Sequence, residues 1–327
     1  MGKKSIVRIG VVGVGHLGKF HVQQYQTIHN VDCVGIFDVD SRCAGGVSKA
    51  YNVKSYKNLD DLLSRCDAVS ICTPTSTHYS VAKQALNLGC HVFIEKPITT
   101  NIAEAEKLIL LSDNNKKMIQ VGHIERFNPA FCAFNKESVR PEFIESHRLA
   151  PFNIRGTDVD VILDLMIHDI DILLQIIQSD INQINASGVS ILSDTIDMAN
   201  TRIEFTNGCV ANLTASRISQ KQLRKFRIFE KNIYTNIDFL NPCVETYMLS
   251  NKQPEKDGSY IVVNENSEKF ILYDKPNIVS HNALKVELEA FIQSITNCIN
   301  PAVSAKDGLA ALQVAIQIRD QINSKNN

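Results

Sequence analysis

The sequence predicts an α/β domain with a parallel sheet, followed by an α+β domain whose large open sheet is mostly antiparallel. Short apolar runs alternate with helical segments from residue 6 to about residue 121, which is the pattern of βαβ units. After about residue 143, alternating strands joined by hairpin turns replace this pattern. A length of 327 residues suits two domains that each bury a core. We expect domains at residues 1–125 and 126–327.

Composition excludes several classes of protein. The chain is 44% hydrophobic and 21% charged, as ordinary globular proteins are. Its 34 basic and 35 acidic residues leave a net charge of -1, too little to attract a nucleic-acid backbone or an anionic membrane. No stretch approaches the ~20 apolar residues that span a bilayer. Nine cysteines without a C-x-x-C pair are typical of reduced thiols, so we expect a cytoplasmic protein without a metal site.

The elements of the first domain follow in order. Strands are expected at residues 6–12, 32–37, 68–72, 91–94 and 118–121. Helices are expected at residues 19–28, 58–64, 80–88 and 103–112. Ligands bind beyond the carboxyl ends of such strands. The residues that follow the strand ends should therefore meet at one edge of a doubly wound sheet: Gly13, Asp38, Thr73, Glu95 and Gly122.

The loop after the first strand carries a nucleotide-binding pattern. Gly13 permits a tight turn, Gly15 lets a pyrophosphate approach the backbone, and Gly18 lets the helix pack closely on the strand. The helix N-terminus offers unpaired N–H groups to the phosphates. Strand, glycine loop, helix and acid stand at the spacing of the Rossmann fingerprint. The cofactor-binding residues of this motif are Gly13, Gly15, His16, Leu17, Gly18 and Asp38.

Asp38 decides which dinucleotide is expected. It lies twenty residues after Gly18 and can accept hydrogen bonds from both hydroxyls of the adenosine ribose. A carboxylate repels a 2′-phosphate, which favours NAD. Ser41 and Arg42 could still receive a phosphate, so NADP stays open.

The second domain is predicted to combine one buried helix with a sheet. Strands are expected at residues 143–149, 184–192, 199–205, 210–218, 226–229, 233–239, 245–249, 260–263 and 270–273. Helices are expected at residues 159–177, 282–297 and 306–324, the last two packing back as closing helices. An open antiparallel sheet leaves one face needing cover. We therefore expect a homodimer or a homotetramer.

Three polar groups interrupt the apolar helix at residues 159–177. Asp164, His168 and Asp171 stand at i, i+4 and i+7 and share one face of an α-helix. Buried carboxylates are costly unless paired, so this stripe indicates the wall of a cleft. The alternatives are a hydrogen-bonded core histidine and a metal site at Asp164 and His168, for which no other ligand cluster is visible.

Lys96 is the candidate catalytic lysine. It follows an apolar strand and precedes Pro97, which fixes the backbone at the functional edge of the sheet. A nearby cationic nicotinamide would depress the lysine pKa and make Lys96 a usable acid–base or polarising group.

Three motifs resemble those of the Gfo/Idh/MocA oxidoreductases. They are Glu95-Lys96-Pro97, the segment 122–129, and the segment 164–171 with its D-x-x-x-H-x-x-D pattern. The segments 146–151, 155–161 and 207–217 are similar to UDP-N-acetylglucosamine 3-dehydrogenases, which make a 3-keto sugar on the way to the 3-amino sugar of lipid A. The resemblance implies that a further set lines the cofactor cleft: Thr73, Pro74, His78, Glu95, Lys96 and Arg126, with Asn128 as a weaker member.

The resemblance and the residues together predict NAD-dependent oxidation of a secondary alcohol of a sugar, at C3 of UDP-N-acetylglucosamine. His168 is the candidate base, Asp164 would orient its ring, and Lys96 would stabilise the developing alkoxide. The sequence does not decide which of Lys96 and His168 takes the proton. Arginines that could bind the diphosphate of a UDP-sugar complete the substrate-binding set: Lys96, Arg148, Arg155, Asp164, His168 and Arg217.

Two other functions stay open. The first is a dehydrogenase of the same family that acts on an inositol, a free aldose or another small alcohol or carbonyl compound. The second is a non-catalytic sensor that binds NAD, against which the intact Lys96, Asp164 and His168 argue. Tyr234, Phe239 and Tyr247 could stack on uracil, although core or interface packing is more typical of such residues.

Overall fold

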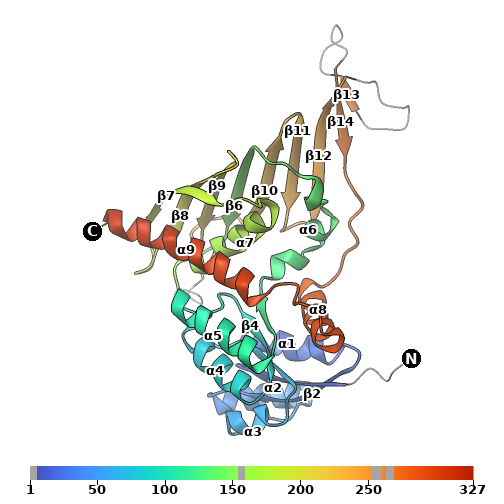
Figure 1. Ribbon diagram of the computed structural model, residues 1–327, viewed down its shortest axis with the longest axis vertical. Helices are drawn as coiled ribbons and strands as arrows, with labels where there is room; N and C mark the ends of the chain where they lie inside the picture. The colour runs from blue at the N-terminus through green and yellow to red at the C-terminus, as the bar shows by residue number, and fades with distance from the viewer. Residues whose placement is uncertain (1–5, 154–158, 252–259, 263–268, 327) are drawn as a thin grey trace. The chain divides into compact units, whose positions relative to one another are not determined.

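The first sheet carries the predicted nucleotide-binding loop. In the computed structural model, which describes residues 6–153, 159–251, 260–262 and 269–326, its described strands run parallel in the order β2-β1-β3-β4-β5 (Figure 1). They are β1 Val7–Val12, β2 Val31–Phe37, β3 Ala68–Ile71, β4 His91–Glu95 and β5 Ile119–Gly122. The order reverses between β1 and β3, the point at which open α/β sheets bind ligands.

Helices cover both faces of this sheet. They are α1 Gly18–Tyr25, α2 Ser41–Tyr51, α3 Leu59–Leu63, α4 Thr75–Asn87, α5 Ile102–Asn115 and α8 Ala283–Asn297. The helix α2 was not predicted, because Gly45 and Gly46 weaken its helical pattern. Asp40 begins it by accepting the backbone N–H of Arg42 at 2.9 Å. The predicted start of α4 at residue 80 was wrong, since the helix begins directly after Pro74.

The helix α8 belongs to the first unit, although it follows the second sheet in sequence. The chain divides into one unit of Met1–Ile124 with Asn282–Gln313 and another of Glu125–His281 with Val314–Asn327. In the first unit, the rings of Phe93 on β4 and Phe291 on α8 lie 5.8 Å apart, edge to face. Both side chains are fully buried. The observed boundary at residue 124 adjoins the expected one, whereas residues 282–313 were expected in the second domain.

The second sheet has nine described strands in the order β13-β14-β12-β11-β10-β6-β9-β8-β7. They are β6 Phe143–Leu149, β7 Ile181–Val189, β8 Met198–Phe205, β9 Val210–Ser216, β10 Leu223–Glu230, β11 Ile233–Asp238, β12 Cys243–Ser250, β13 Tyr260–Val262 and β14 Phe270–Asp274. Neighbouring strands are antiparallel except β6 and β9, which are parallel. The carboxyl ends of β6 and β9 therefore lie side by side.

A helix covers most of the predicted residues 159–177, but part of it is not α-helical. Residues Ile162–Met166 form a π-helical turn, and the α-helix α7 covers Ile167–Ile176. Asp160 begins the segment, because its Oδ1 accepts the backbone N–H groups of Ile162 at 3.0 Å and Leu163 at 2.9 Å. Asp164 therefore lies in the π turn, and His168 lies in the first turn of α7.

Two further α-helices and two 3-10 helices, Ile124–Phe127 and Lys136–Ser138, belong to the described part of the chain. The short helix α6 covers Pro129–Ala133 and was not predicted, because five residues give too little periodicity. Asn128 begins it by accepting the backbone N–H of Ala130 at 3.0 Å. The last helix, α9, covers Ala305–Asn326, and Gln321 on it donates to the carbonyl of Ile184 on β7 at 2.8 Å. None of the described helices is long and apolar enough to cross a membrane.

Candidate active site

The glycine loop has the geometry of a dinucleotide cradle. Gly13 adopts a φ of +80°, and its N–H donates to the carbonyl of Phe37 at 2.8 Å. A Cβ at Gly18 would lie 1.9 Å from the carbonyl oxygen of Gly13, so only glycine fits there. A Cβ at Gly15 would meet nothing within 4 Å. The space over Gly15 is therefore open to a pyrophosphate, and these residues fit the dinucleotide that the motif predicts.

Backbone groups hold Asp38 at the end of β2. Its Oδ2 accepts the N–H of Val14 at 2.8 Å, and its Oδ1 accepts the N–H of Asp40 at 2.9 Å. These bonds orient the carboxylate beside the glycine loop. The side chain of Arg42, which could receive a 2′-phosphate, is 94% exposed in the first turn of α2. Asp38 therefore lies beside the glycine loop, where the motif predicts the ribose of the cofactor. The side chain of Arg42, four residues further along the chain, lies in solvent.

His16 and Leu17 lie at the start of α1. His16 is exposed, and its ring meets Phe20 edge to face with the centroids 5.6 Å apart. Leu17 is 47% exposed, and its carbonyl accepts the N–H of Phe20 at 2.9 Å. Their side chains thus stand in solvent beside the open loop, where a cofactor would cover apolar surface.

His78 ties two loops of this edge together. Its Nδ1 lies 2.9 Å from the carbonyl oxygen of Pro97, and its Nε2 lies 2.9 Å from that of Thr73. The ring is buried, and this burial lowers the pKa of His78. Pro74 immediately precedes α4. Through these contacts His78 positions the backbone on both sides of the predicted cofactor site, at Thr73 and at Pro97.

Glu95 has a histidine partner that the sequence did not predict. His21 on α1 is buried, and its Nε2 lies 2.9 Å from Oε1 of Glu95. Burial alone would raise the pKa of Glu95, but the hydrogen bond of His21 and the charges of His21 and Lys96 hold it below its ordinary value. A Cβ at Gly122 would lie 2.9 Å from Oε2. His21, buried on the face that carries Tyr25, could have been found as a polar residue in an apolar helical stripe.

Lys96 lies directly after β4, as predicted, and its side chain is half-buried. Its position at a strand end follows from the register of β4 with β5, in which Glu95 pairs with Gly122. The structure thus brings Thr73, Glu95 and Gly122 to one edge of the first sheet, together with Gly13 and Asp38.

In the second unit, an ion pair between Arg126 and Asp171 holds the helix that carries the predicted polar residues. Both oxygens of Asp171 accept from Arg126, with a Nε–Oδ2 distance of 2.7 Å. The side-chain oxygen of Gln175, one turn further along α7, also accepts from Arg126. Arg126, predicted to line the cofactor cleft, therefore anchors the helix that carries Asp164 and His168.

Arg148 is buried and doubly paired. Its Nε donates to Asp169 at 3.0 Å, and its Nη1 donates to Glu125 at 2.7 Å. Burial opposes the charge, but the two carboxylates more than offset it and raise the pKa of Arg148 above its ordinary value. Only 3% of the side chain is exposed. This geometry favours a structural role over the diphosphate-binding role that the sequence predicted for Arg148.

Arg217 is held by a loop that wraps around Asp197. Its Nε donates to Asp197 at 2.9 Å, its Nη1 to the carbonyl of Val159 at 2.8 Å, and its Nη2 to Ser193 at 2.8 Å. Asp197 is fully buried and also accepts three backbone N–H groups. Burial raises the pKa of Asp197, but these donors more than offset it and hold the pKa well below the usual range. These hydrogen bonds therefore hold the Arg217 side chain in one position.

A pocket lies at the carboxyl ends of β6 and β9 and has a volume of about 350 Å³. Leu149 and Ser216 are partners in the parallel ladder, so the residues that follow them lie side by side. The π turn contributes Asp164, and the segment before β10 contributes Gln222. The pocket is lined by Ala150, Pro151, Phe152, Asn153, Asp164, Leu165, Arg217 and Gln222. It therefore joins two predicted substrate residues, Asp164 and Arg217.

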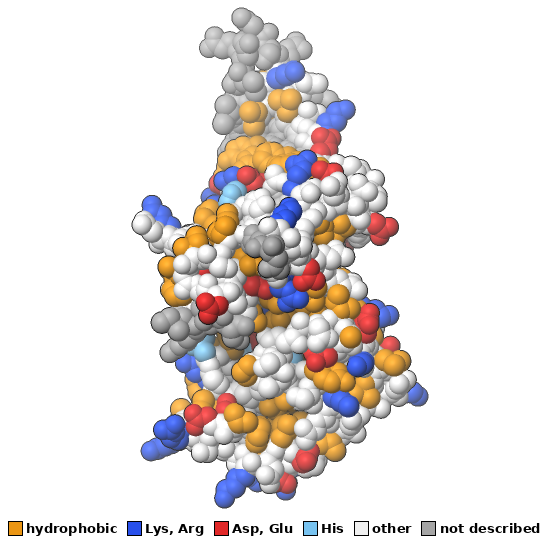
Figure 2. Space-filling view, turned by 90° about the vertical axis from the view of Figure 1, so that its left-hand side faces the viewer, with side chains coloured by type: hydrophobic (Ala, Val, Ile, Leu, Met, Phe, Trp, Pro, Cys, Tyr) orange, Lys and Arg blue, Asp and Glu red, His pale blue; other side chains and the backbone are white. Residues whose placement is uncertain are grey.

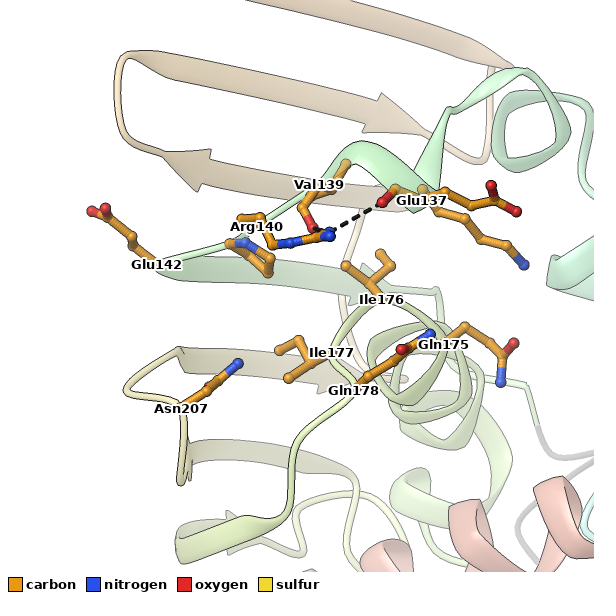
Figure 3. A pocket seen from close by; sticks show the side chains of 11 residues that line it. Glu137, Val139, Arg140, Glu142, Gln175, Ile176, Ile177, Gln178 and Asn207 are labelled. Atoms are coloured by element: carbon orange, nitrogen blue, oxygen red, sulfur yellow. Dashed lines mark hydrogen bonds between the residues drawn. The ribbon is translucent and has the colours of Figure 1, made fainter.

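A larger pocket, of about 730 Å³, lies at the opposite end of β6 (Figure 3). Residues of the segment 136–142, the end of α7 and the turn at Asn207 line it. Arg140 donates there to the carbonyls of Glu137 at 3.0 Å and Val139 at 2.8 Å. None of the predicted site residues lines it. The smaller pocket is therefore the better candidate for the chemistry, despite its size.

The structure gives less information on the remaining predictions. Arg155 lies outside the described residues. Within the described part of the chain, no group of three histidine, cysteine or acidic side chains could hold a metal ion. On the face shown in Figure 2, basic and acidic side chains are interspersed. His168 lies in the first turn of α7 and is half-buried.

Comparison with known proteins agrees with this geometry. Residues 7–123 match an oxidoreductase family described as having an NAD-binding Rossmann fold, and residues 118–231 match the GFO/IDH/MocA C-terminal domain. The UDP-N-acetylglucosamine 3-dehydrogenase of Acidithiobacillus ferrooxidans is 36% identical over 315 residues, covering 96% of each chain. A solved structure of that enzyme has a TM-score of 0.88 at 34% identity and covers 97% of this chain and 98% of that chain.

More distant relatives share the fold. The myo-inositol 2-dehydrogenase of Thermotoga maritima is 24% identical over 348 residues, covering 98% of each chain. A scyllo-inositol dehydrogenase structure from Lactobacillus casei has a TM-score of 0.79 at 23% identity, covering 99% of this chain and 98% of that chain. Fold and loop together define an NAD-binding oxidoreductase. The chain belongs to the Gfo/Idh/MocA family. The predicted family, fold class and enzyme class are therefore confirmed.

Proposed function

We propose that the protein oxidises a secondary alcohol of a sugar with NAD, and that this alcohol is the C3 hydroxyl of UDP-N-acetylglucosamine. The observation that carries the substrate is the 36% identity to a UDP-N-acetylglucosamine 3-dehydrogenase over 96% of both chains. The pocket that contains Asp164 supports a substrate site on the second unit. The 3-keto product would then supply the 3-amino sugar of lipid A, and a cytoplasmic location stays a prediction.

The glycine loop and Asp38 would hold the cofactor. Backbone N–H groups at the start of α1 suit the pyrophosphate, and Asp38 suits the ribose of NAD rather than a 2′-phosphate. Glu95, with its depressed pKa, is a charged acceptor for the hydroxyls of the nicotinamide ribose. When bound, NAD⁺ takes up the carbon-bound hydrogen of the alcohol together with two electrons.

The chain's own residues would manage the proton and the charge on oxygen. We assign the hydroxyl proton to His168, which accepts it as the O–H bond breaks and the C=O bond forms. Asp164, in the π turn before it, would stabilise the imidazolium, as a carboxylate does in a triad. Lys96 would donate a hydrogen bond to the reacting oxygen. The ketone, NADH and one proton are the balanced products.

An assay with trapping tests the proposed reaction. Purified protein is incubated with NAD⁺ and a panel of UDP-sugars, free sugars and inositols, while NADH absorbance is followed. A hydrazine reagent traps the ketone, because the oxidation of a secondary alcohol is unfavourable at equilibrium. The proposal requires a trapped 3-keto product from UDP-N-acetylglucosamine.

The same panel separates the competing functions. Turnover of inositols or free aldoses alone would replace the nucleotide-sugar proposal with an inositol or aldose dehydrogenase, which the relative from Thermotoga maritima favours. NAD binding without turnover of any substrate in the panel would instead support the sensor.

The exposed face of the second sheet supports a homo-oligomer. Phe143, Phe229, Tyr234, Tyr247 and Tyr273 are successive partners across β6, β10, β11, β12 and β14. Their ring centroids lie 5.8, 5.0, 5.7 and 5.1 Å apart. We call these five residues the aromatic row. All five side chains are half-buried or exposed, so they form a continuous apolar strip that a partner could cover.

Charges beside the aromatic row are paired within the chain. Glu145 accepts from Arg227 at 2.7 Å, and Glu245 forms an ion pair with Lys275 at 3.5 Å and accepts from Tyr273 at 3.0 Å. Because the aromatic row is apolar and the charges beside it are paired, the same surface of a second copy can pack against it without burying an unpaired charge. A second copy of the chain, related by a two-fold axis, is therefore the proposed partner.

A further inference from the structure

The pocket at the ends of β6 and β9 combines two side-chain carboxamides with apolar surface. Asn153 and Gln222 each carry a carbonyl acceptor and an amino donor, while Phe152 and Leu165 contribute apolar area. Gln222 is exposed just before β10, whose Leu223 pairs with Leu149 of β6. The β10–β6 register therefore places Gln222 beside the segment that carries Phe152 and Asn153.

The size of the pocket limits the part of a substrate that it can hold. Its volume of about 350 Å³ is near the lower limit for small-molecule sites, ~300 Å³. It suits one sugar ring with its substituents rather than a complete nucleotide sugar. Arg217, the cation among the described lining residues, already donates to Asp197, Ser193 and the carbonyl of Val159. The described lining therefore suits a neutral ring better than a diphosphate.

Asp164 sets the orientation of that ring. It lines this pocket and belongs, in the proposed function, to the group that removes the hydroxyl proton. The reacting carbon must then lie near Asp164, and a substituent on a neighbouring carbon falls within the same pocket. In an N-acetylhexosamine that is oxidised at C3, the neighbouring carbons carry the 2-acetamido group and the 4-hydroxyl group. Of these two, only the acetamido group offers both an amide and a methyl group to the carboxamides and apolar side chains of this lining.

From these observations, and resting on the proposed function, we infer that this pocket recognises the 2-acetamido group of the substrate and that Gln222 is a specificity-determining residue. A carboxamide side chain can donate to the acetamido carbonyl and accept from the acetamido N–H. The methyl group would pack on Phe152 and Leu165. A 2-hydroxyl group can donate and accept, but it is too short to contact both polar atoms of the carboxamide at once and has no methyl group for Phe152 and Leu165. Sites built to hydrogen-bond a substrate discriminate strongly against analogues that leave their polar groups unpaired.

The experiment compares UDP-N-acetylglucosamine with UDP-glucose, which carries a 2-hydroxyl group. Substrate affinity of the NAD-loaded enzyme is measured by calorimetry, and turnover is measured by ketone trapping. Gln222→Met keeps the length of the side chain but removes the amide. We expect it to weaken binding of UDP-N-acetylglucosamine at least tenfold and to change the affinities for UDP-glucose and NAD less than twofold. Gln220→Met is the matched control, since Gln220 is exposed in the same segment but does not line the pocket.

The outcomes separate the two hypotheses. If wild-type protein oxidises UDP-N-acetylglucosamine but Gln222→Met retains full affinity for it, or weakens both UDP-sugars equally, the acetamido assignment is overturned and the proposed function stands. If wild-type protein neither binds nor oxidises UDP-N-acetylglucosamine, both are overturned. Selective loss for UDP-N-acetylglucosamine in Gln222→Met, with the Gln220→Met control unchanged, supports the inference.

Discussion

Gly15 and Gly18 lie in one loop, but glycine is needed at the two positions for different reasons. A Cβ at Gly15 meets no protein atom within 4 Å, whereas one at Gly18 lies 1.9 Å from the carbonyl oxygen of Gly13. We expect Gly15→Ala to change the free energy of unfolding by less than about 1 kcal/mol and to weaken NAD binding at least tenfold. Gly18→Ala should lower the free energy of unfolding by about 1–3 kcal/mol. Calorimetric NAD titration and thermal unfolding measure both, and equal stability losses would contradict this account.

Lys96 and His168 are predicted to act on the proton and the charge of the reacting alcohol. Lys96→Ala and His168→Ala should each lower kcat by about 10²–10⁴-fold and leave the NAD dissociation constant within twofold of wild type. Single-turnover kinetics measures the rate of the chemical step, and calorimetry measures the NAD dissociation constant. Full activity in both variants would discard the proposed mechanism.

The pair of His21 and Glu95 predicts a pH-dependent stability. His21→Leu removes a buried hydrogen bond to a carboxylate and should lower the free energy of unfolding at pH 7 by about 1.5–3 kcal/mol. Since the folded-state pKa of Glu95 is depressed, its contribution is complete above the ordinary value of 4.5 and is lost as the pH falls through the lower folded pKa. The deficit of His21→Leu should therefore shrink below pH 4.5.

Urea unfolding followed by circular dichroism measures this deficit, because the chain has no tryptophan to report by fluorescence. Gln23→Leu is the control, since Gln23 is exposed on the same helix. A deficit that stays constant as the pH falls from 7 to well below 4.5 would show that Glu95 gains no stabilisation from His21.

At the scale of elements, Arg148 joins three segments of the second unit. It connects β6 to Asp169 on α7 and to Glu125, which precedes α6. Arg148→Met would leave the buried Asp169 without its cation partner and would leave Glu125 with only the longer contact to Arg224 at 3.4 Å. We expect a loss of about 3–5 kcal/mol in the free energy of unfolding, measured by urea unfolding. A stable Arg148→Met enzyme with weakened UDP-sugar binding alone would restore the substrate-binding role that the sequence predicted.

The bounds of the strands were predicted best where the hydrophobic pattern covers the whole strand. The β6 bounds agree with the prediction at both ends, and β1 differs by one residue. The prediction of β7 was three residues late, because the polar residues Asn182 and Gln183 follow Ile181 and hide the start of the strand. The π turn at Ile162–Met166 could not be predicted, since apolar residues surround it and local sequence carries no signal for an extra residue per turn.

At the scale of the whole molecule, the aromatic row predicts self-association. Phe229→Glu combined with Tyr234→Glu places charges in the middle of the strip and should convert the oligomer to a species of half the mass or less. Sedimentation velocity measures that mass. Leu110→Glu is the control, because Leu110 is 62% exposed on α5, away from the second sheet. A wild-type protein that sediments as a monomer would refute the proposed interface.

The candidate site was predictable where a single stretch of chain specifies the chemistry. The glycine loop, Asp38, Glu95 and Lys96 can be placed together from their spacing, because strand ends of a parallel sheet meet at one edge. The segment 164–171 was assigned to the site by its resemblance to the family motif. The partners of the charged residues could not be found in this way. Arg148 and Arg217 have the same sequence character as free arginines, and only their distances to Asp169 and Asp197 show that both are engaged.

The sequence by itself determined the family, the two kinds of sheet and the dinucleotide loop, because each depends on local periodicity or on short fixed spacings. The tertiary structure alone decided which charges are paired, that residues 282–313 return to the first unit, and that β6 and β9 are parallel. That parallel pairing brings Phe152, Asp164 and Arg217 around one pocket. The physical reason is that pairing between segments far apart in the chain depends on the total burial and hydrogen bonding of the fold, which no local pattern contains.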